Sequence, residues 1–311
     1  MLNRFRCLMG AVALLSLPAQ AIQFSADVSD ASWRVVSSPF ECRVEQYIPV
    51  MGQASFYQRA GEPLRFELVA DSVFPLRGTS SVHLVAPSWN AQLDSRKVYE
   101  FTPPRLDYLS FESTLAKQLL EGLLRGYVAE IYDDNPAVPR DHVAVVPVRF
   151  RPAYRDFQHC MAQLLPQNFE QIARSKIAFA SGGYQLSETD RERLREVARY
   201  VLNDKEVNAV YIDGHTDNVG ERNENLELSR LRAEQVALYL IQQGVNPDFV
   251  ALRYHADFYP LVSNASASNR AKNRRATVRL AKEPNATVRE KLYRAMVKAD
   301  APENNSLHPQ Q

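Results

Sequence analysis

The chain has 311 residues, with 37 lysines and arginines against 36 aspartates and glutamates, so its formal net charge is +1 at pH 7. This balance excludes a global electrostatic attraction to nucleic acid or acidic lipid. The apolar fraction of 45% and the charged fraction of 23% are those of a soluble globular protein, which excludes a mainly disordered or collagen-like chain. The length indicates about two domains.

The first 21 residues have the pattern of a secretory signal peptide. Arg4 and Arg6 precede an apolar run at 8–17, and the small residues Ala19 and Ala21 mark a cleavage site after Ala21. An uncleaved membrane anchor is the alternative, but a run of about ten residues is half of what a membrane span needs. We therefore expect export and cleavage.

Cleavage would leave two cysteines, Cys42 and Cys160. An exported chain meets an oxidising compartment, where two cysteines tend to pair, so we predict a disulfide between them. In the chain-entropy model a bridge closing a loop of this length contributes about 4–5 kcal/mol. Two inert buried thiols are the alternative.

Residues 22–165 are rich in predicted strands. One helix is expected among them, because four apolar residues spaced i, i+3, i+4 and i+7 form one helical face, and Gly126 would end it. No phosphate-binding loop or catalytic motif occurs here, so this part is interpreted as a docking module in the form of an antiparallel sheet or small barrel. The predicted strands cover 33–36, 42–50, 64–70, 81–86, 97–101 and 142–150, and the helical face is Ala116, Leu119, Leu120 and Leu123.

Residues 166–282 alternate strands and helices. Ser187 is a predicted helix cap, and Gly244 would end a second helix. This order predicts right-handed crossovers and parallel strand pairing. The predicted strands are 176–180, 207–213, 249–254 and 275–280, and the helical stripes are Leu194, Val197, Ala198 and Val201, then Ala233, Val236, Ala237 and Leu240.

The expected fold class is therefore α+β with two domains, an N-terminal antiparallel β module with a helix and a C-terminal βαβαβ-type α/β sandwich. The predicted boundaries are 1–21 for the signal peptide, 22–165, 166–282, and a polar, partly disordered tail at 283–311. Within this tail Val288, Leu292 and Val297 suggest a short helix.

The second half carries a motif with a recognisable order. Gly214-His215-Thr216-Asp217 is followed by Gly220, Asn225, the run 228–233 (Leu-Ser-Arg-Leu-Arg-Ala), Asn264 and the run 269–275 (Asn-Arg-Ala-Lys-Asn-Arg-Arg). This set resembles the OmpA-like peptidoglycan-binding domain, whose pattern is GHTD, G, N, LSxxRA, N and GRAxNRR. Two departures are Asn269 in place of Gly and 254–257 in place of a GYG-like turn, and they bear on the final loop more than on the ligand site.

Asp217 and Arg232 are the main candidates for ligand binding. Asp217 opens the loop after a strand, and Arg232 is expected in the first turn of the next helix, so the crossover would bring them together at the open edge of the sheet. A carboxylate suits an ammonium group, and a guanidinium fork suits a carboxylate, so the pair suits a zwitterion. The resemblance implies that this zwitterion is diaminopimelate of a peptidoglycan stem peptide, with Asn225, Thr216 and Val219 at the same site.

Each candidate also has a structural interpretation. Asp217 and Arg232 could form an interior salt bridge, and Asp213 and His215 are expected to be structural. The cations at 270–275 are expected to form a solvated face or to pair with carboxylates, with Arg274 and Arg275 as secondary candidates for cell-wall contact.

A metal site is not expected. Asp213, His215 and Asp217 alternate along one strand, and such ligands cannot converge on an ion without help from elsewhere. The sequence predicts no cofactor, no metal and no catalytic residue.

Motifs along the whole chain extend the resemblance. Those at 33–35, 40–42, 157–160 and 164–169 (Trp-Arg-Val, Phe-Glu-Cys, Phe-Gln-His-Cys and Leu-Leu-Pro-Gln-Asn-Phe) resemble the MotY family of flagellar-motor proteins. The resemblance implies a periplasmic, non-enzymatic part of the T ring. Its N-terminal module would dock to the flagellar basal body and a MotX-like ring protein, stabilising the stator complex around the rotor, while its C-terminal domain holds peptidoglycan. The family's paired cysteines match Cys42 and Cys160.

Two alternatives come from other functional classes. One is a general envelope-integrity linker that binds peptidoglycan without a role in motility, and the other is a cell-wall hydrolase.

Overall fold

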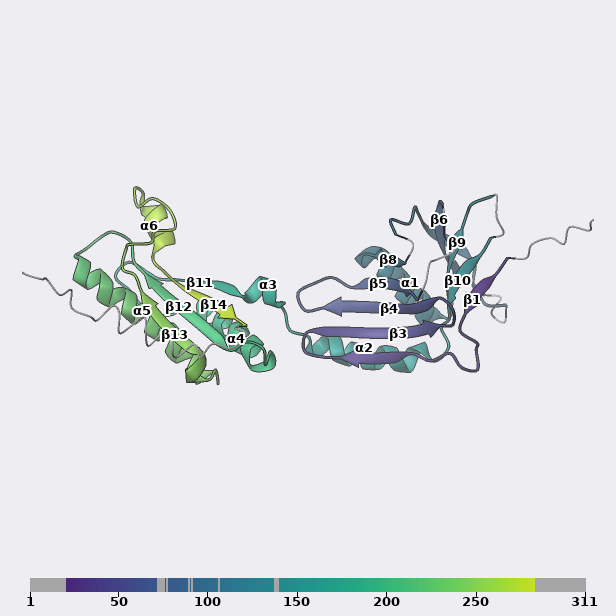
Figure 1. The fold of residues 1–311 in the computed structure, drawn as a ribbon, viewed down its shortest axis with the longest axis horizontal. Helices are drawn as coiled ribbons and strands as arrows, with labels where there is room; N and C mark the ends of the chain where they lie inside the picture. The colour runs from purple at the N-terminus through teal and green to yellow at the C-terminus, as the bar shows by residue number, and fades with distance from the viewer. Residues whose placement is uncertain are drawn as a thin grey trace, which may run out of the picture. The chain divides into compact units, whose positions relative to one another are not determined.

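The computed structural model describes residues 21–71, 76, 78–88, 90, 92–105, 107–136 and 140–282. The chain forms two compact units (Figure 1), one extending through Gln58 and over Pro63–Gln163, the other comprising Arg59–Glu62 and the chain from Leu164 on. Residues 1–20 of the predicted signal peptide lie outside the described residues, as does the tail at 283–311 with its predicted helix.

The first unit contains two five-stranded sheets, ordered β2-β3-β4-β5-β8 and β1-β10-β9-β6-β7. The strands of the first sheet are β2 (Arg34–Ser37), β3 (Glu41–Ile48), β4 (Gly52–Arg59), β5 (Arg65–Ala70) and β8 (Tyr108–Phe111). Those of the second are β1 (Gln23–Ser25), β10 (His142–Val145), β9 (Val128–Asp133), β6 (Ser80–Val85) and β7 (Arg96–Phe101). Neighbouring strands run antiparallel, as predicted, except that β1 pairs with β10 in parallel.

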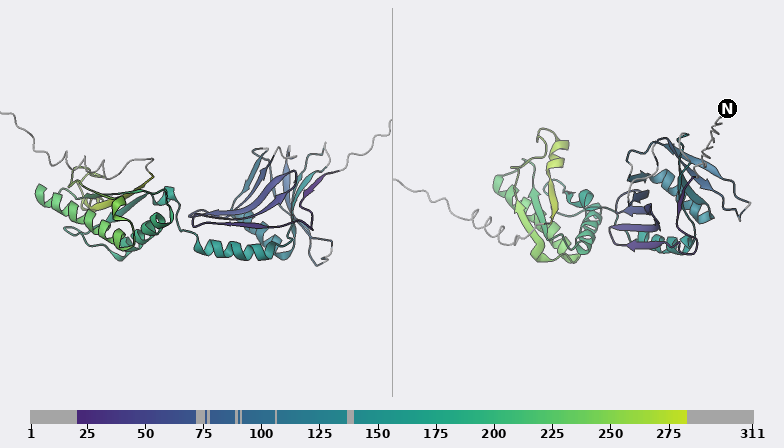
Figure 2. Two further views of the ribbon diagram at one scale, coloured as in Figure 1. Left: turned by 60° about the horizontal axis from the view of Figure 1, so that its bottom comes forward. Right: turned by 45° about the vertical axis from the view of Figure 1, so that its right-hand side comes forward.

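Two helices pack against these sheets. Helix α1 (Ser113–Arg125) ends at Gly126, whose φ of 97° lies in the left-handed region that glycine adopts without strain, as the sequence predicted. Gly122 allows α1 to approach β6 closely, since a Cβ there would lie 2.5 Å from Leu84 Cδ2. Helix α2 (Phe150–Gln163) covers β2 and β3 (Figure 2).

Parts of the sequence prediction for this unit are wrong. The strand expected at 142–150 ends at Val145, and Phe150 begins α2, so the unit has a second helix within the described residues. Phe150, Ala153, Phe157 and Cys160 form the buried stripe of α2. Strands β1, β4, β8 and β9 were not predicted, because their short apolar runs lie among polar residues.

Aromatic residues and the predicted disulfide hold α2 to the first sheet. The Phe150 ring centroid lies 4.6 Å from that of Trp33 and 5.9 Å from that of Phe56. Cys42 of β3 and Cys160 of α2 form a disulfide with their Cα atoms 5.8 Å apart, which confirms the predicted pairing. The bridge therefore joins segments 118 residues apart in sequence.

The second unit is a four-stranded sheet ordered β11-β14-β12-β13. Its strands are β11 (Arg174–Ala178), β14 (Arg275–Ala281), β12 (Ala209–His215) and β13 (Val250–Tyr254). Its helices are α3 (Phe169–Ile172), α4 (Glu188–Asn203), α5 (Arg222–Gln242), the 3₁₀ turn η1 (Pro247–Phe249) and α6 (Ala267–Asn273). Helices α4 and α5 pack side by side against the sheet (Figure 2), and Ser187 caps α4 through a bond from the Asp190 amide, as predicted.

The strand pairing corrects one prediction. Only β12 and β13 are parallel, because β14 lies between β11 and β12 and runs antiparallel to both. The prediction of parallel pairing from β11 to β12 is therefore wrong. β14 has a buried, alternating apolar side at Ala276, Val278 and Leu280, which suits the centre of a sheet.

Within the described residues no helix combines the length and apolar character that a membrane span needs.

Candidate ligand-binding site

The candidate site lies where the central strand β12 ends and the chain passes through residues 216–221 into α5. Gly214 is needed at this point because α5 crosses β12 closely: a Cβ on Gly214 would lie 2.0 Å from the Ser229 carbonyl oxygen. The Thr216 amide then donates to the Ala256 carbonyl at 2.8 Å, which joins the loop to the segment after β13. The backbone just before Asp217 is therefore held by α5 on one side and by the segment after β13 on the other.

Asp217 is 6% exposed and forms an ion pair with Arg274. Its Oδ2 lies 2.9 Å from Arg274 NH1, and its Oδ1 accepts a hydrogen bond of 3.2 Å from the Val219 amide. Arg274 also donates from Nε to the Phe179 carbonyl at 3.2 Å. The carboxylate is therefore held by one guanidinium and one backbone amide at the edge of the sheet.

Arg232 is completely buried and binds three backbone carbonyls. Its Nε donates to Gly183 at 2.8 Å, NH1 to His215 at 2.8 Å and NH2 to Ala180 at 3.2 Å. Its guanidinium carbon lies 5.2 Å from the centre of the Phe179 ring. Burial lowers the pKa of Arg232 to about 10, opposed by the nearby Asp217 charge, so the side chain stays protonated at neutral pH.

The geometry of the expected Asp217–Arg232 pair is corrected by these contacts. Helix α5 begins at Arg222, so Arg232 lies ten residues inside the helix and not in its first turn. Among the described residues, Asp217 has its ion pair with Arg274, and Arg232 has no carboxylate oxygen within 4 Å. A direct salt bridge between Asp217 and Arg232 is therefore absent from this structure.

The other predicted residues of the site gather around the same loop. Asn225 is 5% exposed and donates from Nδ2 to the Val219 carbonyl at 3.1 Å, so it closes the loop. The Val219 side chain is 59% exposed at the rim. Thr216 is 2% exposed, and its Oγ1 has no hydrogen-bond partner among the described residues. Buried hydroxyls are normally bonded, so this one is available to a bound group.

Arg275 forms its hydrogen bonds with residues outside this loop. It donates from NH1 to the Asn273 carbonyl at 3.2 Å and from NH2 to the Tyr259 carbonyl at 3.1 Å, and burial lowers its pKa. It is 7% exposed, so its contacts are those of a structural residue.

Asp213 is held by its neighbours on β13 and beyond. Its Oδ1 lies 2.6 Å from Arg253 Nε and 2.8 Å from His255 Nε2. Burial opposes ionisation, but the hydrogen bonds from His255 and Arg253 outweigh it and lower the pKa of Asp213 to about 2.

His215 is held in its neutral form. Burial, aided by the charge of Arg275, lowers the pKa of His215 to about 4, and its Nδ1 has no partner among the described residues. The described part of the chain contains no cluster of three or more His, Cys, Asp or Glu placed to hold a metal ion.

Asn273 is a residue of the site region that sequence reasoning missed. It is fully buried and binds the segment after β13: Oδ1 accepts from the Leu261 and Val262 amides at 2.8 and 3.1 Å, and Nδ2 donates to Asn264 Oδ1 at 2.7 Å. Its place in the run 269–275 was the available signal. Asn269, the departure from Gly, occupies an ordinary helical position in α6.

The segment at 254–257, the other departure, retains an unusual backbone. Ala256 has a φ of 44°, a left-handed conformation that glycine adopts more readily, and its amide donates a hydrogen bond to Ser229 Oγ at 3.2 Å. The chain thus keeps a tight turn here without the glycine.

Comparison with known proteins identifies two domains. Residues 24–166 match the MotY N-terminal domain, and residues 178–274 match the OmpA family. The chain is 26% identical to the sodium-type flagellar protein MotY of Vibrio parahaemolyticus over 281 residues, which are 86% of this chain and 94% of that protein.

Further matches cover a smaller part of the chain. The chain is 39% identical to the peptidoglycan-binding protein ArfA of Mycobacterium tuberculosis over 107 residues, which are 34% of this chain and 32% of that protein. The crystal structure of the C-terminal domain of Helicobacter pylori MotB matches with 23% identity and a TM-score of 0.33, covering 41% of this chain and 98% of that one.

Proposed function

We propose that this chain, which carries a MotY N-terminal domain followed by an OmpA-family domain, is a periplasmic structural protein of the flagellar motor that binds peptidoglycan through Asp217. The observation that carries the proposal is the Asp217–Arg274 ion pair at the open end of β12. It presents one carboxylate and one guanidinium to a ligand, next to the hydroxyl of Thr216 that has no partner among the described residues.

An ion pair of this kind can exchange partners with a zwitterion. The head group of diaminopimelate carries an ammonium and a carboxylate on one carbon. Its ammonium replaces the Arg274 guanidinium at Asp217 Oδ2, and the released guanidinium binds the ligand carboxylate as a fork. No charge is left buried without a partner, so the exchange avoids the large penalty of an isolated buried ion.

Arg232 acts in this scheme mainly by holding the site together. Its bonds to the His215, Ala180 and Gly183 carbonyls fix the backbone that precedes Asp217 and the segment that faces it. A ligand carboxylate that displaces the Ala180 carbonyl would receive a charge-assisted bond from Arg232 in place of a neutral one. Asn225 and Val219 then define the shape of the loop.

The motor role follows from what a torque generator needs. A stator that produces torque must be held against a stationary support, and the covalent peptidoglycan net is such a support. The first unit would dock to the basal body and a MotX-like ring protein, and the second would hold the wall. A single site for a small zwitterion is weak, but copies repeated in a ring bind by avidity if their spacing permits. The likeness to MotY over 86% of the chain supports this assignment.

Co-sedimentation with purified peptidoglycan tests the binding site. Asp217→Asn keeps the size of the side chain and removes its charge, and hydrogen bonds to charged groups contribute about 1.5–3 kcal/mol, so binding should weaken roughly ten- to a hundredfold. Asp248→Asn, at an exposed position of η1, is the matched control and should bind like the wild type. Wild-type binding by folded Asp217→Asn protein would remove Asp217 from the site.

Fluorescent localisation tests the motor assignment. The mature chain should gather at flagellar bases and disperse in cells without a basal body, and its deletion should impair swimming. Normal swimming after deletion would favour a general envelope linker. Release of soluble fragments from purified peptidoglycan by the protein would favour a hydrolase.

A further inference from the structure

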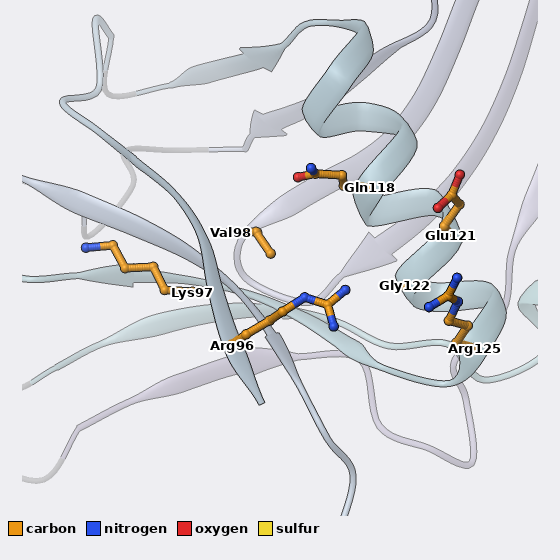
Figure 3. Close-up of a pocket in the computed structure, with 7 residues that line it drawn as sticks. All are labelled: Arg96, Lys97, Val98, Gln118, Glu121, Gly122 and Arg125. Atoms are coloured by element: carbon orange, nitrogen blue, oxygen red, sulfur yellow. The ribbon is translucent and has the colours of Figure 1, made fainter. Parts of the chain in front are cut away.

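A groove runs along β7 in the first unit, between this strand and α1. Two cavities of about 450 and 420 Å³ form it. The first is lined by Arg96, Lys97 and Val98 of β7 and by Gln118, Glu121 and Arg125 of α1 (Figure 3). The second is lined by Tyr99 of β7, by Ser110 and Phe111 of β8, and by residues 112–115 at the start of α1.

The strand that lines the groove is the edge of its sheet. β7 is the last strand in the order β1-β10-β9-β6-β7, and among the described strands it pairs only with β6. The backbone groups on its other side therefore have no strand partner among the described strands. Such an edge is a template for one more strand.

One end of the groove is mainly cationic, with three cations against one carboxylate. Arg96 and Arg125 extend toward each other from the strand and the helix (Figure 3), and neither guanidinium lies within 4 Å of a carboxylate oxygen of the described residues. Arg96 contacts the Tyr127 ring at 5.4 Å, and Lys97 pairs with Glu100. Glu121 is the one acidic residue lining this cavity. Two facing guanidiniums form a receptor for a carboxylate.

The other end of the groove is aromatic. Tyr99 is 47% exposed, and its ring centroid lies 6.0 Å from that of Phe111, an edge-to-face contact. Phe101 lies 5.0 Å from the same ring. Leu115 of α1 adds an apolar wall, while Ser110, Glu112, Ser113 and Thr114 give the cavity polar sides. The exposed Tyr99 ring therefore offers one apolar contact at this end.

From this juxtaposition we propose that an extended, acidic segment of a partner protein adds to β7 as a further strand. One of its carboxylates lies between Arg96 and Arg125, and an apolar side chain farther along lies over Tyr99. Main-chain bonds to the strand edge supply affinity, and the two ends of the groove fix direction and register. A second copy of this chain is disfavoured as the occupant, because its β7 would bring like charges together.

This inference deepens the docking role proposed above by naming the surface and the chemistry of the partner, and it rests on that role only for its biological meaning. Binding of a peptide in solution involves neither the cell wall nor the basal body. The groove can therefore fail its test while peptidoglycan binding and localisation stand, and the reverse also holds.

The test uses a library of random dodecapeptides selected on the mature full-length chain. Enriched peptides should carry acidic residues followed by an apolar residue at alternating positions. The affinity of a synthetic copy should fall at least tenfold for Arg96→Glu/Arg125→Glu. It should stay within twofold for Arg155→Glu, a matched exposed arginine on α2. Replacing the peptide's acids by lysine should abolish binding to the wild type and restore it to the double variant.

Amide hydrogen exchange separates strand addition from contact by side chains alone. The bound peptide should slow exchange at 98–101 and leave the edge strand β13 of the second unit unchanged. Failure to enrich acidic peptides, equal affinity for the charge-reversed variant, or unchanged exchange along β7 would each overturn the proposal.

Discussion

Replacing Arg232 with lysine tests whether this residue supports the fold of the second unit. Arg232 has no exposed surface, and its three bonds join α5 to the end of β12 and to the segment at 180–183. A lysine ammonium reaches one or two of the three carbonyls, so one or two lose their partner. Each buried polar group without a partner costs about 1–3 kcal/mol, so we expect a loss of about 2–5 kcal/mol.

The loss should appear in thermal unfolding of the mature chain. For a domain of about 100 residues each kcal/mol lowers the melting temperature by about 4 °C, so the transition of the second unit should fall by about 8–20 °C. Arg230→Lys is the matched control, since Arg230 lies on the same helix with ion pairs to Glu227 and Glu234 at the surface. It should change stability by less than about 0.5 kcal/mol. A melting temperature for Arg232→Lys within 2 °C of the wild type would show that these three bonds do not stabilise the second unit. Arg232 would then be a candidate for direct contact with the ligand.

Three further predictions concern stability. Cys42→Ser or Cys160→Ser should destabilise the first unit by about 4 kcal/mol, since the bridge closes a loop of 118 residues, and denatured wild-type protein without reductant should show no reactive thiol at either position. Gly214→Ala should cost about 3 kcal/mol in urea unfolding, because its methyl group would meet the Ser229 carbonyl at 2.0 Å, and wild-type stability would contradict the observed packing. His215 has a pKa of about 4 in the folded state against 6.5 in the unfolded state, so its neutral form contributes full stability above pH 6.5. As the pH falls to 4, about 3 kcal/mol of the free energy of unfolding of the second unit should be lost. His215→Gln should flatten this pH dependence of the urea midpoint, and an unchanged slope would refute the prediction.

Several helices with a clear local signal in the sequence, such as an apolar stripe, a capping serine or a terminal glycine, were predicted correctly. Helix α1 has an apolar stripe and a terminal glycine, and α4 has a capping serine, so both were predicted. Helix α2 has a similar stripe, yet the preceding apolar run at 142–150 was interpreted as one strand. The change from strand to helix occurs inside that run, where periodicity over so few residues does not distinguish the two.

The sequence predicted candidate residues that lie around the loop after β12, but it did not predict their hydrogen bonds and ion pairs. The order and spacing of the OmpA-like motif pointed to Asp217, Asn225 and Arg232, because this pattern can be read directly from the sequence. The partner of Asp217 is Arg274, which precedes β14, and β14 lies between β11 and β12. That placement depends on long-range packing, which no local pattern encodes. The burial of Arg232 has the same origin, because the carbonyls that it binds come from segments 17 to 52 residues away.

Calorimetric titration with muropeptides tests the central claim most directly. The side chain of diaminopimelate in a stem peptide ends in a carbon that bears both an ammonium and a carboxylate, whereas the side chain of lysine in the corresponding peptide ends in an ammonium alone. Exchange of partners at the Asp217–Arg274 pair predicts that the mature chain binds the diaminopimelate peptide at least tenfold more tightly, and that Asp217→Asn removes this preference while Asp248→Asn keeps it. Equal affinity for the two peptides, or an unchanged preference in folded Asp217→Asn protein, would contradict the account.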